Sequence, residues 1–564
     1  MNTPHPEGPE VPEVNVSLRP LRVAAATGAL FLLLGGPAPA DRLITTDGRI
    51  LDVVKARELP DGGYRLVFQS GEIHCSAEHV ASVEIEGDMS DYVPQNDDEK
   101  QKLARGFVRY RGKWLSKPAY RSQLNKQAQE SRKRTEELAA HANFSNAWEK
   151  ETKHFVIRTN TSPELLEFYD ELLEGFYKLM DDRIGIKPTP TLKRTKMVVN
   201  IYKSHDEFLS YNPEMSRSVL GFFSSTDQTL NFFHDYQEPS RSTWVALHEC
   251  THLLTYLIEQ QYLHQIWMNE AVADYFGSSE FTKDKRGRLV IVPGKIQVDR
   301  ILTVQQAIKD GKDIRLEKLF LIDRNSFQGF QYAHAWSFVF FLNEANPKYA
   351  KAFNKFFKDL YTLKLKGVRA ETINTGLYDK LGMRKRYKPE DIRDQLLKRL
   401  GTDIDSLEKE WKDFIAGTEI DAPEARFKRG YNVVRGGRRE EFDQAKEDLD
   451  FAIENGITDP RAFRARGLLK LYTGKAAEED LRRAVELAPL LAIFHYDLGR
   501  VLSRSFSPAT SASDKGGREL IGTDEELQEA LEHFGLAMEL DRKNDLYSES
   551  YEGFRAALEK RKTQ

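Results

Sequence analysis

Two histidines four residues apart, His248 and His252, are the residues of this chain best suited to chemistry, and Glu249 directly follows the first. On an α-helix, this spacing places both imidazoles on one face, one turn apart, where they can bind the same metal ion. The glutamate between them can then take a proton from a water molecule at that ion. A single histidine on an apolar helix face is more often a hydrogen-bonded core residue, so the surrounding sequence decides between the two interpretations.

The surrounding residues predict two consecutive helices. The hydroxyl side chains of Ser240, Ser242 and Thr243 are typical N-caps and precede an apolar helical run at 244–258. A second helix is predicted to begin near Ile266, and on it Glu270 and Asp274 are again four residues apart. The two helices therefore present two pairs of polar side chains at helical spacing.

These two pairs predict a zinc site. A catalytic Zn²⁺ needs three protein ligands and one open position, and His248, His252 and Glu270 supply three. Asp274 can accept the second ring N–H of a ligand histidine and so fix its tautomer. Ionisable groups on two apolar helices would be costly to bury unless something pairs them, which favours the metal site over separate core residues.

The two motifs, HECTH at 248–252 and EAVAD at 270–274, resemble those of the gluzincin metallopeptidases, in which HExxH is followed on the next helix by ExxxD. The sequence around the second motif is most similar to an uncharacterised bacterial family of peptidase-MA-like domains. The resemblance covers about residues 149–418. It implies an α+β peptidase domain with a mixed sheet and a helical lobe, Zn²⁺ as cofactor and Glu249 as general base.

The same resemblance implies a hydrogen-bond donor to the reaction's oxyanion near the start of a later apolar helix. Tyr332 is the candidate and His334 the reserve, and a packed aromatic is the alternative interpretation of Tyr332. The spacer of 17 residues between His252 and Glu270 is slightly short for this group, so a tight loop is required. Glu259 is a poorer alternative ligand.

The N-terminus predicts export. Arg19 and Arg22 precede an apolar core at 23–34, and Ala-Pro-Ala at 38–40 is typical of a signal-peptide cleavage site. An uncleaved anchor is the alternative. We expect a periplasmic, cell-envelope or extracellular protein without a stable membrane span after cleavage. Its two cysteines, Cys75 and Cys250, fall in different predicted domains and are expected to be free and buried.

The 564 residues are too many for a single core and predict an α+β multidomain protein. The net charge of −4 argues against general nucleic-acid binding, and the basic stretch at 100–134 is interpreted as a solvated helical linker. The predicted order is a signal peptide at 1–40, a small SH3-like β barrel at 41–88, a hairpin and charged helical linker at 89–148, a peptidase-MA-like zinc domain at 149–418 and tetratricopeptide (TPR)-like helical repeats at 419–564.

Local patterns support this order. Asp-Gly turns between alternating runs predict the hairpins of the β unit, and the chain beyond Glu270 is expected to be helical to about residue 418. In the last segment, Ala452 and Ala484 are 32 residues apart, near the TPR period. Stacked repeats form a concave surface that binds peptides or proteins, so a protein partner is expected there.

The function predicted is that of an exported zinc metallopeptidase acting on a peptide or protein substrate. The hairpin at 219–233 either pairs with that substrate as an edge strand or is only structural. The rival hypothesis is a catalytically inactive peptidase-like scaffold that binds partners through its TPR and β modules. An aminopeptidase is a third option, but no acidic Gly-rich motif that would hold a free N-terminus precedes His248.

Overall fold

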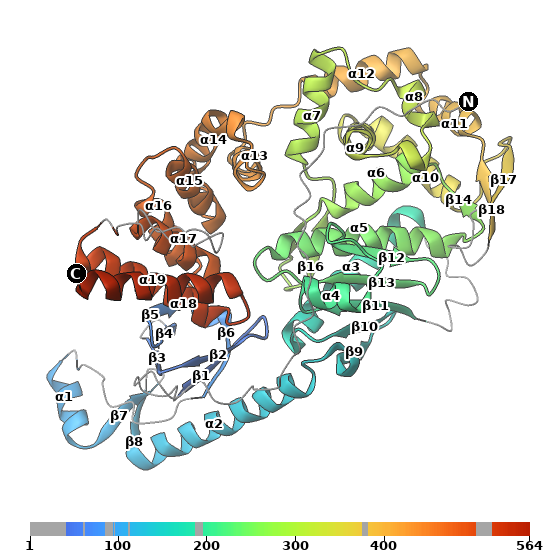
Figure 1. The fold of residues 1–564 in the computed structure, drawn as a ribbon. Helices are drawn as coiled ribbons and strands as arrows, with labels where there is room; N and C mark the ends of the chain where they lie inside the picture. Colours follow the sequence, from blue (N-terminus) through green and yellow to red (C-terminus); the bar gives the residue numbers. More distant parts are fainter. Residues whose placement is uncertain are drawn as a thin grey trace, which may run out of the picture. The chain divides into compact units, whose positions relative to one another are not determined.

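The computed structural model describes residues 41–59, 62–84, 94, 96–110, 113–185, 196–374, 382–503, 520 and 522–563. The architecture is α+β and multidomain, with small sheets near the N-terminus and a helical C-terminal half (Figure 1). The predicted signal peptide lies outside the described residues. Within the described ranges, no helix is both long enough and apolar enough to cross a membrane.

The N-terminal β unit consists of six short strands: β1 (Asp41–Thr45), β2 (Ile50–Val53), β3 (Lys55–Glu58), β4 (Tyr64–Val67), β5 (Glu72–Cys75) and β6 (Val80–Glu84). They form two three-stranded sheets, β2-β1-β6 and β3-β4-β5. The prediction of a closed SH3-like barrel is wrong for the described residues. Only Val54 separates β2 from β3, so the chain passes from one sheet to the other at that residue and no strand is long enough to belong to both.

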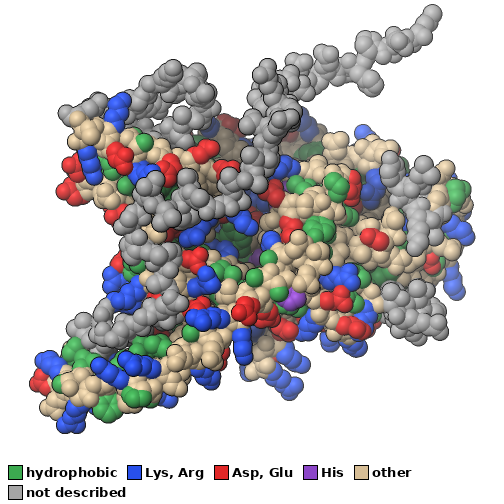
Figure 2. All heavy atoms as spheres, turned by 60° about the horizontal axis from the view of Figure 1, so that its bottom comes forward, with side chains coloured by type: hydrophobic (Ala, Val, Ile, Leu, Met, Phe, Trp, Pro, Cys, Tyr) green, Lys and Arg blue, Asp and Glu red, His purple; other side chains and the backbone are tan. Residues whose placement is uncertain are grey.

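A short hairpin and a long charged helix follow, as the sequence predicts. The elements are α1 (Asp97–Ala104), β7 (Phe107–Tyr110), β8 (Lys113–Ser116) and α2 (Lys117–Ala140). The Ser116 hydroxyl accepts a hydrogen bond from the Ala119 N–H and caps α2, whose first turn contains Pro118. Only three residues of α2 are buried, which is typical of a solvated helix. On the face shown in Figure 2, basic and acidic side chains are interspersed.

A five-stranded mixed sheet follows, in the order β12-β13-β11-β10-β9. The two inner ladders, β10 with β11 and β11 with β13, are parallel, and the edge strands pair antiparallel. Helix α5 packs against β12 and β13, and α3 packs against β10. The bounds are β9 (Trp148–Glu151), β10 (Phe155–Thr159), α3 (Pro163–Ile184), β11 (Met197–Tyr202), α4 (His205–Tyr211), β12 (Gly221–Ser224), β13 (Thr229–Phe233) and α5 (Pro239–Ile258).

The helices beyond this sheet share its hydrophobic core. Helix α6 contacts both α5 and α9, so the second motif lies beside the first (Figure 1). The helices are α6 (Ile266–Gly277), α7 (Val298–Lys309), α8 (Leu316–Leu321), α9 (Gly329–Glu344), α10 (Pro347–Tyr361), α11 (Pro389–Leu400) and α12 (Ile404–Ala416).

The expectation of continuous helix to residue 418 is wrong in two places. One is the hairpin of β15 (Glu280–Lys283) and β16 (Leu289–Val292), whose turn contains Gly287 at a positive φ of 76°. The other is a three-stranded sheet, β14-β18-β17, formed by β14 (Tyr262–Leu263), β17 (Ala370–Asn374) and β18 (Met383–Tyr387). Residues of β17 alternate in exposure, which is the strand period rather than the helical one.

Seven helices make up the described part of the C-terminal segment: α13 (Pro423–Arg435), α14 (Phe442–Glu454), α15 (Pro460–Tyr472), α16 (Glu478–Leu487), α17 (Ala492–Leu502), α18 (Asp524–Leu540) and α19 (Asp545–Thr563). Helices consecutive in the chain pack on one another. Glycines allow close approach: a Cβ on Gly430 would lie 2.7 Å from Leu449 Cγ, and one on Gly467 would lie 2.8 Å from Leu481 Cγ.

Candidate metal centre

Helix α5 carries the first motif and begins earlier than the hydroxyl residues suggest. It starts at Pro239, and its N-cap Glu238 makes no side-chain capping bond. The predicted hydroxyl N-cap is therefore wrong: Ser242 Oγ accepts from the Asp235 N–H, and the Thr243 hydroxyl donates to the Ser240 carbonyl. Proline suits the first helical turn because its φ is already helical and its missing N–H is not needed there.

The three predicted ligand side chains meet between α5 and α6. His248 Nε2 lies 3.2 Å from His252 Nε2 and 3.7 Å from Glu270 Oε2, and His252 Nε2 lies 3.5 Å from the same oxygen. Ligand atoms bound tetrahedrally to zinc at about 2.1 Å are about 3.4 Å apart. Two imidazole nitrogens and one carboxylate oxygen at these separations fit a divalent metal such as Zn²⁺.

No other cluster of at least three histidine, cysteine or acidic residues within the described ranges could hold a metal ion. Residues 259–265, which include the strand β14, connect α5 to α6, so the short spacer reaches far enough. Glu259, the alternative ligand, instead accepts a hydrogen bond from the Gln261 N–H at 2.9 Å. Cys250 is buried in the core and does not belong to the cluster, and both cysteines are free and buried, as predicted.

The charges of this cluster stabilise one another. Burial by itself would lower the pKa of His248, but the carboxylates of Asp274 and Glu270 raise it to about 10. Burial would likewise raise the pKa of Glu270, yet contacts with His248 and His252 hold it well below its ordinary value. Metal ligation needs deprotonated ligands, so a bound dication would replace the proton that His248 carries.

Charged and polar residues lie directly behind the ligand side chains. Asp274, which is completely buried, has Oδ1 3.0 Å from His248 Nδ1 and Oδ2 2.5 Å from Nη1 of Arg300 on α7. The amide of Asn269 lies 3.2 Å from His252 Nδ1. The position of Asp274 agrees with the sequence prediction, whereas Arg300 was missed because neither its spacing nor its neighbours link it to the motifs.

Glu249 lies beside the ligands with its carboxylate directed at the edge of the sheet. Its Oε1 is 4.0 Å from His248 Nε2, and its Oε2 accepts a hydrogen bond from the Phe223 N–H of β12 at 3.0 Å. Burial raises the pKa of Glu249 above its ordinary value, although both histidines oppose the shift. A carboxylate with a raised pKa is a more effective proton acceptor near neutral pH.

The two candidate oxyanion donors lie in different places. Tyr332 lines the cavity at the cluster, and burial together with the nearby Glu270 carboxylate raises its pKa. His334 is fully buried, its Nδ1 lies 2.8 Å from the Phe330 carbonyl oxygen, and it is not among the cavity-lining residues. The structure therefore brings Tyr332 to the cluster and leaves His334 in the core.

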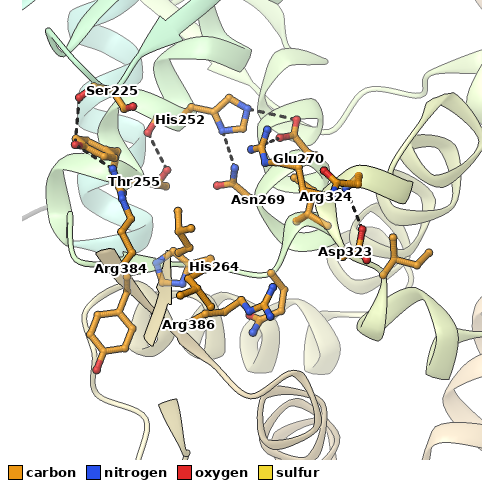
Figure 3. A pocket seen from close by; sticks show the side chains of 18 of the residues that line it. Ser225, His252, Thr255, His264, Asn269, Glu270, Asp323, Arg324, Arg384 and Arg386 are labelled. Atoms are coloured by element: carbon orange, nitrogen blue, oxygen red, sulfur yellow. Dashed lines mark hydrogen bonds and ion pairs between the residues drawn. The ribbon is translucent and has the colours of Figure 1, made fainter. Parts of the chain in front are cut away.

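The cluster opens onto a cavity of about 1060 Å³ (Figure 3). Its walls include Phe222 and Phe223 of the edge strand β12, Tyr332, and residues of β14 and β18. Small-molecule pockets commonly have volumes of about 300–1,000 Å³. This cavity has room for several residues of an extended peptide.

Comparison with known proteins gives a family without an assigned activity. Residues 242–364 match the model of a family described as a protein of unknown function (DUF1570). The matched region contains both motifs and Tyr332. No curated protein matches the chain.

Proposed function

We propose that this chain is a zinc-dependent metallopeptidase of the gluzincin type. The observation that carries the proposal is the convergence of His248, His252 and Glu270 on one point, with ligand atoms 3.2 to 3.7 Å apart, at the wall of a large cavity. A bound Zn²⁺ would polarise the substrate carbonyl and lower the pKa of a water molecule at the site. The acidic residue that such a reaction needs, Glu249, is already beside the cluster.

Each residue has a defined part in peptide hydrolysis. Glu249 takes a proton from the attacking water while the water oxygen bonds to the carbonyl carbon. It then gives a proton to the amine nitrogen as the C–N bond breaks. The Phe223 N–H holds the Glu249 carboxylate in position. The Tyr332 hydroxyl donates to the oxyanion that develops on the carbonyl oxygen. Asp274 and Asn269 orient the two imidazoles.

The position of β12 supports a peptide as substrate. It is an edge strand of the sheet, and Phe222 and Phe223 line the cavity. An extended peptide in the cavity could therefore pair with this edge through main-chain hydrogen bonds.

We also propose that the C-terminal helices are TPR repeats that bind a protein partner and that the protein is exported. The glycines at close helix crossings support the first proposal, because TPR repeats have small residues at such positions. The basic and apolar pattern of residues 19–40 supports the second.

The test is a metal analysis combined with a hydrolysis assay. Purified protein should contain about one zinc per chain and should cleave unfolded casein or a mixed peptide library in a reaction that chelators stop and zinc restores. Zinc bound without turnover of any peptide would contradict the peptidase and favour the scaffold hypothesis.

A further inference from the structure

Strand β18 places two arginines on the wall of the cavity. Arg384 and Arg386 both line it, and Lys385 between them is exposed. This alternation follows from the strand period, which directs every second side chain to the same face. In Figure 3, Arg386 and His264 lie below His252 and Glu270, and the Arg384 side chain extends toward Ser225 and Thr255.

Arg384 is held rigidly in this wall. Arg384 is only 3% exposed, and its guanidinium carbon lies 4.8 Å from the centre of the Tyr256 ring. Its Nη2 donates to the Tyr256 hydroxyl at 3.3 Å, and that hydroxyl donates to the Ser225 carbonyl at 3.2 Å. A preorganised guanidinium loses little conformational entropy when it binds a planar anion.

Arg386 belongs to a group with more positive than negative charge. Its Nη2 lies 2.8 Å from Oε1 of Glu371, and Lys388 Nζ lies 2.6 Å from the other oxygen of the same carboxylate. Two cations thus share one anion. Glu371 does not line the cavity, whereas Arg386 does.

His264 adds polar atoms that lack a partner. Both of its ring nitrogens are buried, and neither has a hydrogen-bond partner within the described ranges. Its ring packs on Tyr361 with centroids 3.8 Å apart, and burial lowers its pKa to about 3, so it is neutral with one donor and one acceptor. Buried polar atoms normally have a partner, and His264 lines the cavity from which a ligand could supply one.

Positive side chains outnumber negative ones on the rest of the cavity wall. Apart from the metal cluster and Glu249, the charged side chains that line it are Arg324, Arg384, Arg386 and Asp323. Arg324 lies 3.7 Å from Glu270 Oε1, beside the metal cluster, whereas Arg384 and Arg386 bring positive charge to the cavity from β18.

We infer that Arg384, Arg386 and His264 form a carboxylate-binding subsite, so that this enzyme selects peptides carrying a carboxylate to one side of the cleaved bond. Arginine recognises carboxylates through paired, charge-assisted hydrogen bonds. The carboxylate comes either from an Asp or Glu side chain or from the C-terminus of the peptide. This inference rests on the proposed peptidase function.

The experiment uses matched peptides and the zinc-loaded full chain. In the first pair, one peptide has Glu and the other has Gln at a single position, and this position is moved along the peptide in a series. In the second pair, one peptide has a free C-terminal carboxylate and the other has a C-terminal amide. We expect kcat/KM to be at least tenfold higher for the carboxylate member of one pair. A preference in the first pair identifies a side-chain subsite, and one in the second identifies a terminal-carboxylate subsite.

Three variants test whether the arginines of β18 cause the preference for the carboxylate peptide. Arg386→Gln and Arg384→Gln should each bring the ratio of kcat/KM between the pair members close to one. Lys385→Glu, on the outward face of the same strand, should keep the wild-type ratio. Equal rates for both members of each pair, or an unchanged ratio in both arginine variants, would overturn the inference.

A binding measurement separates this inference from the peptidase proposal. Fluorescence anisotropy with labelled peptides and zinc-loaded Glu249→Gln protein measures affinity without turnover. We expect the carboxylate peptide to bind with a tenfold lower Kd than its uncharged partner, and Arg386→Gln to abolish this difference. That result supports the subsite even if no peptide is cleaved. Equal Kd values for the two members would overturn the subsite whether or not the protein is a peptidase.

Discussion

At the scale of the residue, the His248 imidazole has one carboxylate beside each of its two ring nitrogens, and the two carboxylates have different proposed roles. Glu270 lies on the Nε2 side, where the metal would bind, and Asp274 lies 3.0 Å from Nδ1. Arg300 in turn approaches the second oxygen of Asp274 at 2.5 Å. This series of contacts would orient the imidazole before a metal binds, and each contact can be tested separately.

Glu249→Gln should separate metal binding from catalysis. Glutamine keeps the size of the side chain and Glu249 is not one of the three proposed ligands, so we expect full zinc content with hydrolysis reduced by about three or more orders of magnitude. Zinc content by mass spectrometry and kcat/KM on a fluorogenic peptide check this. Undiminished hydrolysis in the variant would contradict the role of general base.

Asp274→Asn should weaken metal binding without removing a ligand. Losing a carboxylate that orients a ligand histidine typically costs 10–100-fold in metal affinity, and competition with a chromogenic chelator would measure the change. Glu259→Gln is the matched control, because Glu259 lies at the C-terminal end of α5 and does not join the cluster. An unchanged zinc Kd in Asp274→Asn would contradict the orienting role.

At the scale of the element, the cluster depends on how closely α5 packs on the edge of the sheet. A Cβ at Gly221 of β12 would lie 2.5 Å from Val245 Cγ1 of α5 and 2.8 Å from Phe232 Cβ of β13. Both contacts are shorter than van der Waals separations allow. Glycine therefore lets β12 reach the helix and bring the Phe223 N–H to Glu249.

Gly221→Ala should destabilise the protein by about 1–3 kcal/mol, because overpacking a tight interface forces the backbone to move. Urea unfolding measures this, and adding Val245→Ala should recover part of the loss. Gly329→Ala is the control: a Cβ there meets nothing within 4 Å and the backbone φ is not positive. Equal stability of the two alanine variants would contradict the close packing.

A buried histidine pair between α17 and α18 should make stability depend on pH. His495 Nδ1 lies 2.9 Å from His533 Nδ1, and His495 Nε2 donates to the Pro489 carbonyl. Burial lowers the pKa of His495 to about 4 and that of His533 to about 3. Both folded values lie below the unfolded value of about 6.5, so the unfolded state binds more protons below that pH.

The free energy of unfolding should therefore be highest above pH 6.5 and should fall as the pH decreases toward 4, by up to about 2 kcal/mol for each histidine at pH 5. Urea unfolding at pH 7.5 and pH 5 measures the difference, and His533→Gln should reduce it. If stability at pH 5 equals that at pH 7.5, the pair is not a source of acid sensitivity.

At the scale of the whole molecule, binding of a metal ion at this cluster would be coupled to folding. The ligands come from two helices within one hydrophobic core, so an ion that binds the folded state should stabilise that core as a unit. A ligand at a thousand times its Kd contributes about 4 kcal/mol if it does not bind the unfolded chain.

Removing the metal should therefore lower the midpoint of the thermal transition that includes residues 149–418 by several degrees. Calorimetry with a chelator, and then with excess zinc, measures the shift and its reversal. His252→Ala is the control and should show the same midpoint with and without zinc. A zinc-induced shift retained in that variant would contradict the assigned ligands.

Local patterns in the sequence determine much of this protein. The spacing of four within each motif, the hairpin before α2 and the strands of the central sheet follow from helix and strand periods, which involve only neighbouring residues. These periods predict which side chains share a face. They do not predict which faces meet, so the closed barrel and the continuous helix to residue 418 were wrong.

Only the tertiary structure decided the rest. It brought Glu270 rather than Glu259 to the two histidines, placed Arg300 behind Asp274, and separated Tyr332 from His334 although the two are only two residues apart. It also placed the arginines of β18 on the cavity wall. The physical reason is that these contacts join segments distant in the chain, and their distances depend on how α5, α6, α7 and β18 pack around one core.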